Sequence, residues 1–169
     1  ALVLHAKGEY DESEKLVREA LAIQRKSLGE EHPHVAASLN NLAMVLQAKG
    51  EYDEAERLYR EALAIRRKSL AEGHPDVALS LNDLLQVLLA KQDWLAAEAI
   101  GRDLLGRERS HGTLAVVAMC LLKQAKYTEA EPILRECLVI REKEIPGDWS
   151  RYNAMSMLGE ALCGEGKHA

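Results

Sequence analysis

The chain repeats itself, and this repetition limits the possible folds more than any other feature of the sequence. The letters GEYDE occur twice, 42 residues apart, and residues 8–49 match residues 50–91 at 30 of 42 positions. Diverged copies follow after 42, 33 and 41 residues. The predicted unit starts lie near Gly8, Gly50, Gln92, Ala125 and Gly166. We therefore predict a single array of about four units over residues 1–169, with a shortened third unit.

Each unit is predicted to contain two helices. Apolar residues follow the i, i+3, i+4, i+7 spacing of a helix face at Leu39, Leu42, Ala43 and Leu46. This spacing predicts a first helix over residues 33–49, a stop at Gly50, and a second helix that runs to about residue 70. Because one helix pair cannot bury its apolar face alone, the units must stack. The sequence predicts an all-α, right-handed superhelix of nine helices.

The composition agrees with packed helices and argues against several classes of function. Apolar residues make up 47% of the chain, whereas aromatic residues make up only 4% and Phe is absent, so Leu and Ala fill the core. A net charge of −5 provides no overall basic field for nucleic acid. The longest uncharged apolar run, residues 114–122, is too short to span a membrane. No signal peptide is visible, although a targeting signal can lie outside this segment. The odd number of cysteines without C-x-x-C spacing favours a reducing, cytoplasmic compartment.

No sequence pattern typical of catalysis, a cofactor or a metal site is present. The three cysteines have no C-x-x-C spacing, and His32 and His34 are two residues apart, which is poor spacing for metal ligands. The carboxylates recur on outer helix faces and have no nucleophile or base beside them. We expect no cofactor and no enzyme activity, and we assign His32, His34 and His74 to turns or helix caps.

One face of the first helix of every unit carries almost no charge. It comprises sixteen positions, of which only Glu160 is charged, although charged residues make up 29% of the chain. Depletion of charge is expected of a surface that meets a partner; the alternative is burial against neighbouring helices of the array. The binding groove is assigned to twelve of these positions. The other four are Ala37, Gly112, Glu160 and Cys163. The predicted groove residues are Asn40, Met44, Gln47, Leu79, Asn82, Gln86, Leu89, Ala115, Met119, Leu122, Asn153 and Ser156.

Asn40 and Asn82 occupy the same place in consecutive units. A carboxamide offers a hydrogen-bond donor and an acceptor, so a row of them can hold the backbone of an extended peptide. The alternative is a local hydrogen bond within or between helices. Apolar contacts to such a peptide are expected from Met44, Leu89, Met119 and Leu122. The same face contains no Lys or Arg, so we do not expect it to clamp a terminal carboxylate.

These residues resemble a known repeat family. A pattern similar to the tetratricopeptide repeat is carried by Leu39, Leu42, Ala43, Gly50, Tyr52, Glu54, Ala55, Tyr59, Ala62 and Leu63. The 42-residue spacing and the His-Pro-x-Val-Ala segments resemble the kinesin-light-chain subgroup, and residues 145–149 resemble its bacterial members. The resemblance covers the whole chain and implies a tetratricopeptide solenoid. It also implies that asparagines at the places of Asn40 and Asn82 hold a peptide backbone.

Two functions from different classes stay open. The first is a scaffold that binds a protein or peptide segment of unknown identity in the groove. The second is a structural, self-assembly or regulatory arm of a larger signalling protein, acting through the ends of the array. The chain begins midway through a first helix and stops where a second helix should start. We therefore expect a segment cut at both ends, whose terminal helices fray or stack end to end with neighbouring chains. We expect Trp149 to pack as a plug in the last turn; the alternative is an exposed side chain that contacts a partner.

Overall fold

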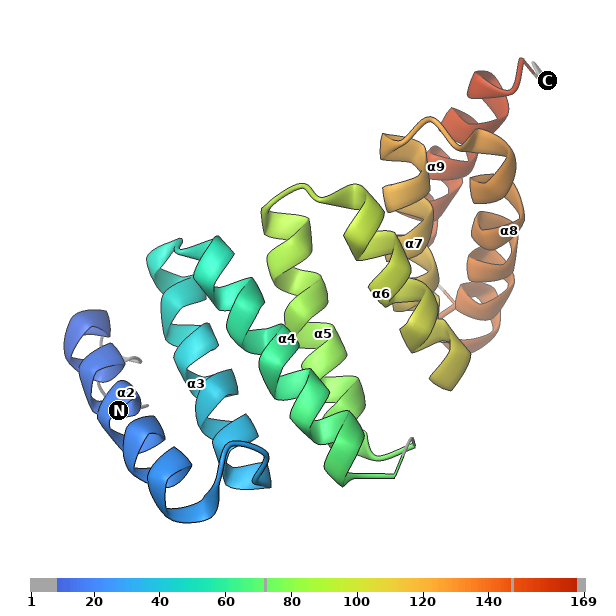
Figure 1. The fold of residues 1–169 in the computed structure, drawn as a ribbon. Helices are drawn as coiled ribbons and strands as arrows, with labels where there is room; N and C mark the ends of the chain where they lie inside the picture. Colours follow the sequence, from blue (N-terminus) through green and yellow to red (C-terminus); the bar gives the residue numbers. More distant parts are fainter. Residues whose placement is uncertain (1–8, 72, 147, 167–169) are drawn as a thin grey trace. The chain divides into compact units, whose positions relative to one another are not determined.

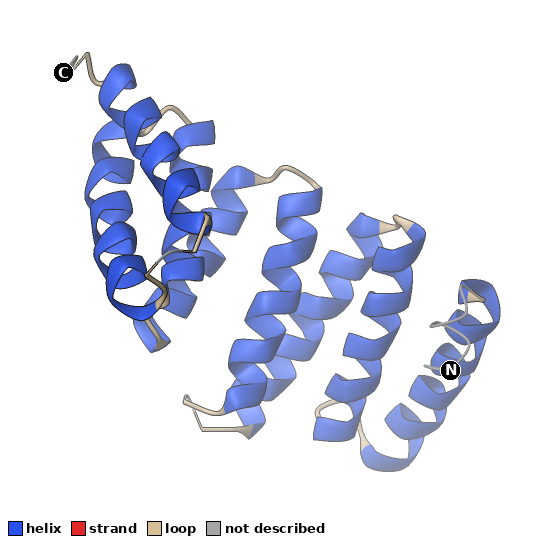
Figure 2. Cartoon of the chain, turned by 180° about the vertical axis from the view of Figure 1, so that it is seen from behind, coloured by secondary structure: helices blue, strands red, loops and turns tan. Residues whose placement is uncertain are grey.

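The computed structural model describes residues 9–71, 73–146 and 148–166. Within these residues the chain forms eight α-helices and no strand (Figure 1, Figure 2). The count differs from the nine predicted helices because the additional one is predicted before Gly8, outside the described residues; the predicted unit start at Gly8 lies there too. The helices fall into two compact units, Ala1–Lys91 and Gln92–Ala169.

The first unit contains the best-preserved repeats. Its helices are α2 (Tyr10–Leu28), α3 (Pro33–Lys49), α4 (Tyr52–Ser69) and α5 (Pro75–Ala90). Helices that follow one another in the sequence pack side by side. The α3 bounds equal the predicted range. The predicted apolar stripe is buried at Leu39, Leu42, Ala43 and Leu46. The helical periodicity therefore located both the helix and its core face.

Gly50 ends α3 in the left-handed conformation that the sequence predicts. Its φ is 81°, and the following N–H donates to the carbonyl of Leu46, five residues back. Ala125 has the same role after α7 (His111–Lys123), with φ 57° and the matching bond to the carbonyl of Leu121. A Cβ makes the left-handed region unfavourable. The later turn therefore keeps the geometry of the repeat at a cost in backbone strain.

The turns before α3 and α5 use histidine as the N-cap. The Nδ1 of His32 accepts a hydrogen bond from the N–H of His34, and the Nδ1 of His74 accepts one from the N–H of Asp76, both at 3.1 Å. A proline follows each cap at the start of the helix, where its missing N–H is not needed. The prediction is confirmed for His32 and His74 as helix caps, whereas His34 lies within the first turn of α3.

A lysine near the end of a first helix contacts a glutamate of the preceding second helix. The pairs, with Nζ–Oε2 distances of 2.7, 2.7 and 3.0 Å, are Lys49–Glu14, Lys91–Glu56 and Lys126–Glu98. Each glutamate also pairs with the arginine four residues later in its own helix. Single exposed ion pairs contribute little to stability. Lys49 and Lys91 occupy equivalent places in consecutive units, whereas Gln124 stands at that place in the third unit and donates to Glu98 at 2.8 Å. The cation there comes from Lys126, two residues later.

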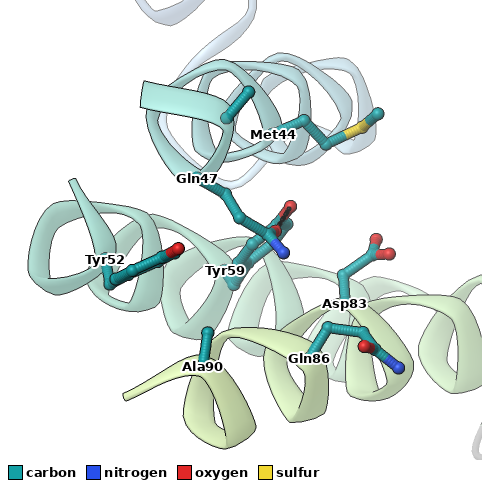
Figure 3. Close-up of a pocket in the computed structure, with 8 residues that line it drawn as sticks. Met44, Gln47, Tyr52, Tyr59, Asp83, Gln86 and Ala90 are labelled. Atoms are coloured by element: carbon teal, nitrogen blue, oxygen red, sulfur yellow. Dashed lines mark hydrogen bonds between the residues drawn. The ribbon is translucent and has the colours of Figure 1, made fainter. Parts of the chain in front are cut away.

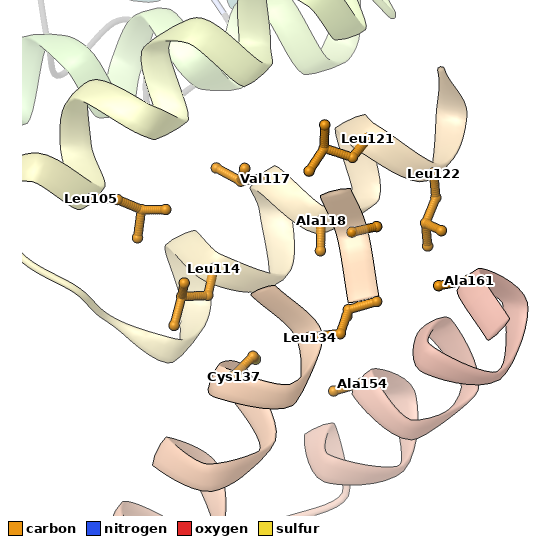
Figure 4. Close-up of a cluster of buried hydrophobic side chains, with 11 residues drawn as sticks. Leu105, Leu114, Val117, Ala118, Leu121, Leu122, Leu134, Cys137, Ala154 and Ala161 are labelled. Atoms are coloured by element: carbon orange, nitrogen blue, oxygen red, sulfur yellow. The ribbon is translucent and has the colours of Figure 1, made fainter. Parts of the chain in front are cut away.

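The second unit has a single core to which all four helices contribute. Its helices are α6 (Trp94–Arg107), α7, α8 (Tyr127–Glu144) and α9 (Ser150–Gly164). Figure 4 shows the buried cluster that joins them, formed by Leu105, Leu114, Val117, Ala118, Leu121, Leu122, Ala130, Leu134, Cys137, Ala154 and Ala161. The shortened third repeat appears here as shorter helices, because α6 and α7 have 14 and 13 residues, whereas α4 and α5 have 18 and 16.

Gly101 allows α6 and α7 to approach closely. It stands where the preceding unit has Tyr59, and it is buried. A Cβ added at Gly101 would lie 2.6 Å from the Cγ2 of Val117, which is shorter than a van der Waals contact. The diverged unit therefore replaces a large side chain by close contact between two helices.

The start of α9 exposes large apolar side chains. Trp149, Tyr152 and Met155 are 74%, 70% and 49% exposed. The expectation that Trp149 packs as a plug is therefore wrong. Because these residues are three apart and Trp149 itself has helical backbone angles, they share one face. We refer to these three residues as the α9 patch.

Candidate binding groove in the first unit

An open hollow is bounded by α3, α4 and α5, with a volume of about 430 Å³. Figure 3 shows side chains from all three helices around it. It is lined by Met44, Gln47, Ala48, Tyr52, Tyr59, Asp83, Gln86 and Ala90. The helices α3 and α5 are the first helices of consecutive repeats, so the hollow lies between two helices to which the groove is assigned.

Asp83 brings a carboxylate into the hollow. Its Oδ2 accepts a hydrogen bond of 2.9 Å from the Nδ2 of Asn40. None of the residues that line the hollow is Lys, Arg or His. Within the described ranges, no ion pair to Asp83 is found. The carboxylate is therefore held by a neutral amide, and its charge is not neutralised by a neighbouring cation.

Asn40 orients this carboxylate from a buried position. The residue is 6% exposed, and its Oδ1 has no hydrogen-bond partner in the described part of the chain. An unpaired buried acceptor costs about 1–3 kcal/mol. Two roles were open for Asn40: direct contact with a peptide, or a local hydrogen bond within or between helices. In this structure Asn40 makes a hydrogen bond between α3 and α5. It acts on the hollow through Asp83.

Tyr59 contributes a fixed hydroxyl group to the hollow. The residue is 1% exposed, and its hydroxyl donates to the Oε1 of Gln47 at 3.0 Å. Burial raises the pKa of Tyr59, and the nearby charge of Asp83 raises it further. The phenol therefore stays protonated, and its hydrogen bond fixes the amide oxygen of Gln47 toward Tyr59.

Three of the predicted groove residues meet at this hollow: Met44, Gln47 and Gln86. Other predicted residues of α5 lie outside its lining: Leu79 and Asn82 are exposed, and Leu89 is half-buried. The Nδ2 of Asn82 donates to the carbonyl of Ala78 in its own helix at 3.0 Å. Asn40 and Asn82 therefore make different contacts, although they occupy the same place in the repeat.

The predicted residues of the second unit differ in exposure. Asn153 and Ser156 are exposed on α9, whereas Ala115 and Met119 are half-buried on α7. Leu122 is 6% exposed and belongs to the core cluster of Figure 4. In this structure Leu122 thus contributes to the core and not to an open surface.

Sequence reasoning missed Asp83, because the predicted stripe follows its neighbour Asn82. Asp83 matches Asn41 of the preceding repeat, and both interrupt the apolar residues in the middle of a first helix. The charged residue among the apolar residues of a first helix is the signal that could have found Asp83. Tyr59 has the spacing of a core residue, and only the packed structure shows that its hydroxyl reaches the hollow. The other lining residues absent from the prediction are Ala48, Tyr52 and Ala90.

The described residues include no group of three or more His, Cys, Asp or Glu side chains placed to hold a metal ion. In the same ranges, no helix combines the length and the apolar character needed to cross a bilayer. Cys120 and Cys137 are buried and Cys163 is exposed. Burial raises the pKa of the Cys120 thiol to about 11, so its reactive thiolate is scarce at neutral pH.

Comparison with known families identifies the repeat. Models described as tetratricopeptide repeat match residues 1–68, 34–107 and 112–145. The first two matches overlap and together cover more than half of the chain. The chain belongs to the tetratricopeptide repeat family. The predicted resemblance is thus confirmed, and tetratricopeptide arrays in general mediate contacts between proteins.

Solved tetratricopeptide structures share this fold at low sequence identity. A putative kinesin light chain with nearly identical repeats from Podosopora anserina is 24% identical, with a TM-score of 0.79 over 98% of this chain and 83% of that one. BtubC from P. vanneervenii is 21% identical, with a TM-score of 0.73 over 97% of this chain and 69% of that one. YrrB, described as a tetratricopeptide protein with an unusual peptide-binding site, is 15% identical, with a TM-score of 0.59 over 98% of this chain and 83% of that one. No curated protein matches the chain in sequence.

Proposed function

We propose that the chain is a non-enzymatic scaffold that binds a protein or peptide segment in the groove formed by the first helices of its repeats. The observation that carries this proposal is the hollow bounded by α3, α4 and α5. Binding sites are typically concave, with apolar walls and a few polar groups that orient the ligand. Met44 and Ala90 supply apolar walls here, and Gln86 and Asp83 supply the polar groups.

The proposed mechanism assigns a separate role to each kind of side chain. The exposed amide of Gln86 offers a donor and an acceptor to the backbone of a bound segment, and the exposed Met44 contacts an apolar side chain. Asn82 lies one residue before Asp83 and is exposed on the same helix. It extends the proposed surface along α5. In this proposal the hollow is the centre of the binding site in the first unit.

Selection of binding peptides tests the proposal. Short random peptides are displayed and selected on the folded chain, and the affinities of the recovered peptides are measured by fluorescence anisotropy. We expect Gln86→Ala and Met44→Ser each to weaken binding by roughly tenfold, the scale of one well-placed contact. Trp149→Ser is the control, because it removes an exposed apolar side chain outside the hollow. The absence of binders, or binders insensitive to both hollow variants, would contradict the proposal.

A second candidate function rests on the α9 patch. Three large apolar side chains on one exposed face favour self-association through α9. In that case the sedimentation coefficient of the chain should rise with concentration. Trp149→Ser combined with Tyr152→Ser should abolish this rise, while Gln86→Ala leaves it unchanged. A chain that sediments as a monomer at all concentrations would eliminate this candidate.

A further inference from the structure

We propose that the hollow selects a cationic side chain, arginine or lysine, and places it against the carboxylate of Asp83. This inference rests on the proposed function, since it names the chemistry of the segment that the groove receives. It begins from the one carboxyl side chain in the wall of the hollow.

Within residues 9–71, 73–146 and 148–166, no cation forms an ion pair with Asp83. The lysines nearest in sequence to the hollow, at the ends of α3 and α5, are already engaged with other acids. Lys49 contacts Asp11, Glu14 and Glu51 at 2.7–3.1 Å. Lys91 contacts Asp53 and Glu56 at 2.6 and 2.7 Å. A cation from the partner therefore gains the attraction of Asp83 without displacing an existing ion pair.

The other groups of the hollow suit the same ligand. A guanidinium group carries five N–H donors and an ammonium group three, and neither accepts a hydrogen bond. The hollow provides acceptors in Asp83 and in the exposed amide of Gln86. Tyr52 is half-buried in the wall of the hollow, but it lies apart from Asp83, so it does not contact the same cation (Figure 3).

The carboxylate is also held in place before a ligand arrives. Asn40 uses its donor on Asp83 and leaves its own buried acceptor unpaired. Such an arrangement fixes the orientation of the carboxylate, and a fixed acceptor loses less freedom when it binds. The raised pKa of Tyr59, to which Asp83 contributes, agrees with a negative potential in this part of the groove.

A double-mutant cycle tests this inference on the displayed peptides. We expect the selected peptides to be enriched in Arg or Lys, and Asp83→Asn to weaken their binding roughly tenfold, as for a lost hydrogen bond to a charged group. Replacing the basic residue of the peptide by Gln should weaken binding to the parent chain by a similar factor. The same replacement should have little further effect on the Asp83→Asn variant. Parallel Arg and Lys peptides then show which cation fits better.

Matched variants separate this inference from the proposed function. Asn occupies the matching position 41, so Asp83→Asn keeps a residue that the repeat already uses and an acceptor for Asn40. Glu19→Gln removes the same charge from an exposed position on α2, and it should leave affinity unchanged. If binding depends on Gln86 and Met44 but not on Asp83 or on a basic residue, the inference fails and the proposed function stands. If no peptide depends on any hollow residue, both fail.

Discussion

Replacing Gly101 by alanine tests how the diverged third repeat packs. In an unobstructed helix this change is favourable, because Ala is about 0.8–1 kcal/mol better than Gly in a helix interior. At Gly101, however, the added Cβ would lie 2.6 Å from the Cγ2 of Val117. Val is a β-branched residue with essentially one rotamer in a helix, so its methyl group cannot simply rotate away. The added Cβ therefore improves helix propensity and at the same time clashes with Val117.

The sizes of the packing cost and of the helix-propensity gain decide whether Gly101→Ala lowers or raises stability. Overpacking a buried site costs about 1–3 kcal/mol. Subtracting the gain in helix propensity leaves Gly101→Ala destabilised by about 0–2 kcal/mol. Gly106 lies in the same helix and is exposed, and a Cβ added there would meet no atom within 4 Å. Gly106→Ala should therefore gain stability, by up to about 1 kcal/mol near the helix end. The difference between the two variants isolates the packing cost.

Urea unfolding followed by circular dichroism measures both variants. We expect the unfolding midpoint of Gly101→Ala to lie below that of Gly106→Ala by the equivalent of about 1–3 kcal/mol. In a Val117→Ala background the clash is removed, so adding Gly101→Ala should then raise the midpoint. If Gly101→Ala is as stable as Gly106→Ala in the parent background, the close approach of α6 and α7 is not as described.

Three further predictions concern the turns, the ion pairs and the thiols. Ala125→Gly should raise the unfolding free energy by about 0.5–1 kcal/mol in urea titrations, because φ 57° favours glycine. Hydrogen bonds, above all from Lys49, hold the pKa of Glu14 below its usual 4.5, so its contribution is present above pH 4.5 and lost as the pH falls through the lowered pKa. The urea midpoints of the parent and Lys49→Met should therefore converge on acidification. In native thiol labelling Cys163 should react first, since Cys120 is buried with a raised pKa.

The repeat itself made much of the fold predictable. Apolar spacing located α3 and its buried face, and glycine at position 50 gave the left-handed turn that the structure shows. These features depend on local periodicity and backbone conformation, which the sequence records directly. The prolines at the starts of α3 and α5 likewise pointed to their histidine caps.

The candidate site was less predictable, because it depends on which side chains meet across helices. Asn40 and Asn82 are equivalent in sequence, yet one is buried against Asp83 and the other is exposed on its own helix. The position after each asparagine differs between the repeats, with Asn41 in one and Asp83 in the next. Periodicity cannot show that this single difference places a carboxylate in the hollow. Trp149 illustrates the same limit, since its exposure follows from the packing of α9 and not from its place in a turn.

The central claim is that partners bind at the hollow of the first unit. Its most direct test is to add a selected peptide to isotope-labelled chain and to follow the assigned nuclear magnetic resonance signals. The account predicts that the largest shifts occur at the methyl group of Met44 and the side-chain amides of Gln47 and Gln86. It also predicts that the indole N–H signal of Trp149 stays in place. Shifts concentrated on the α9 patch, with the three hollow residues unchanged, would contradict the account.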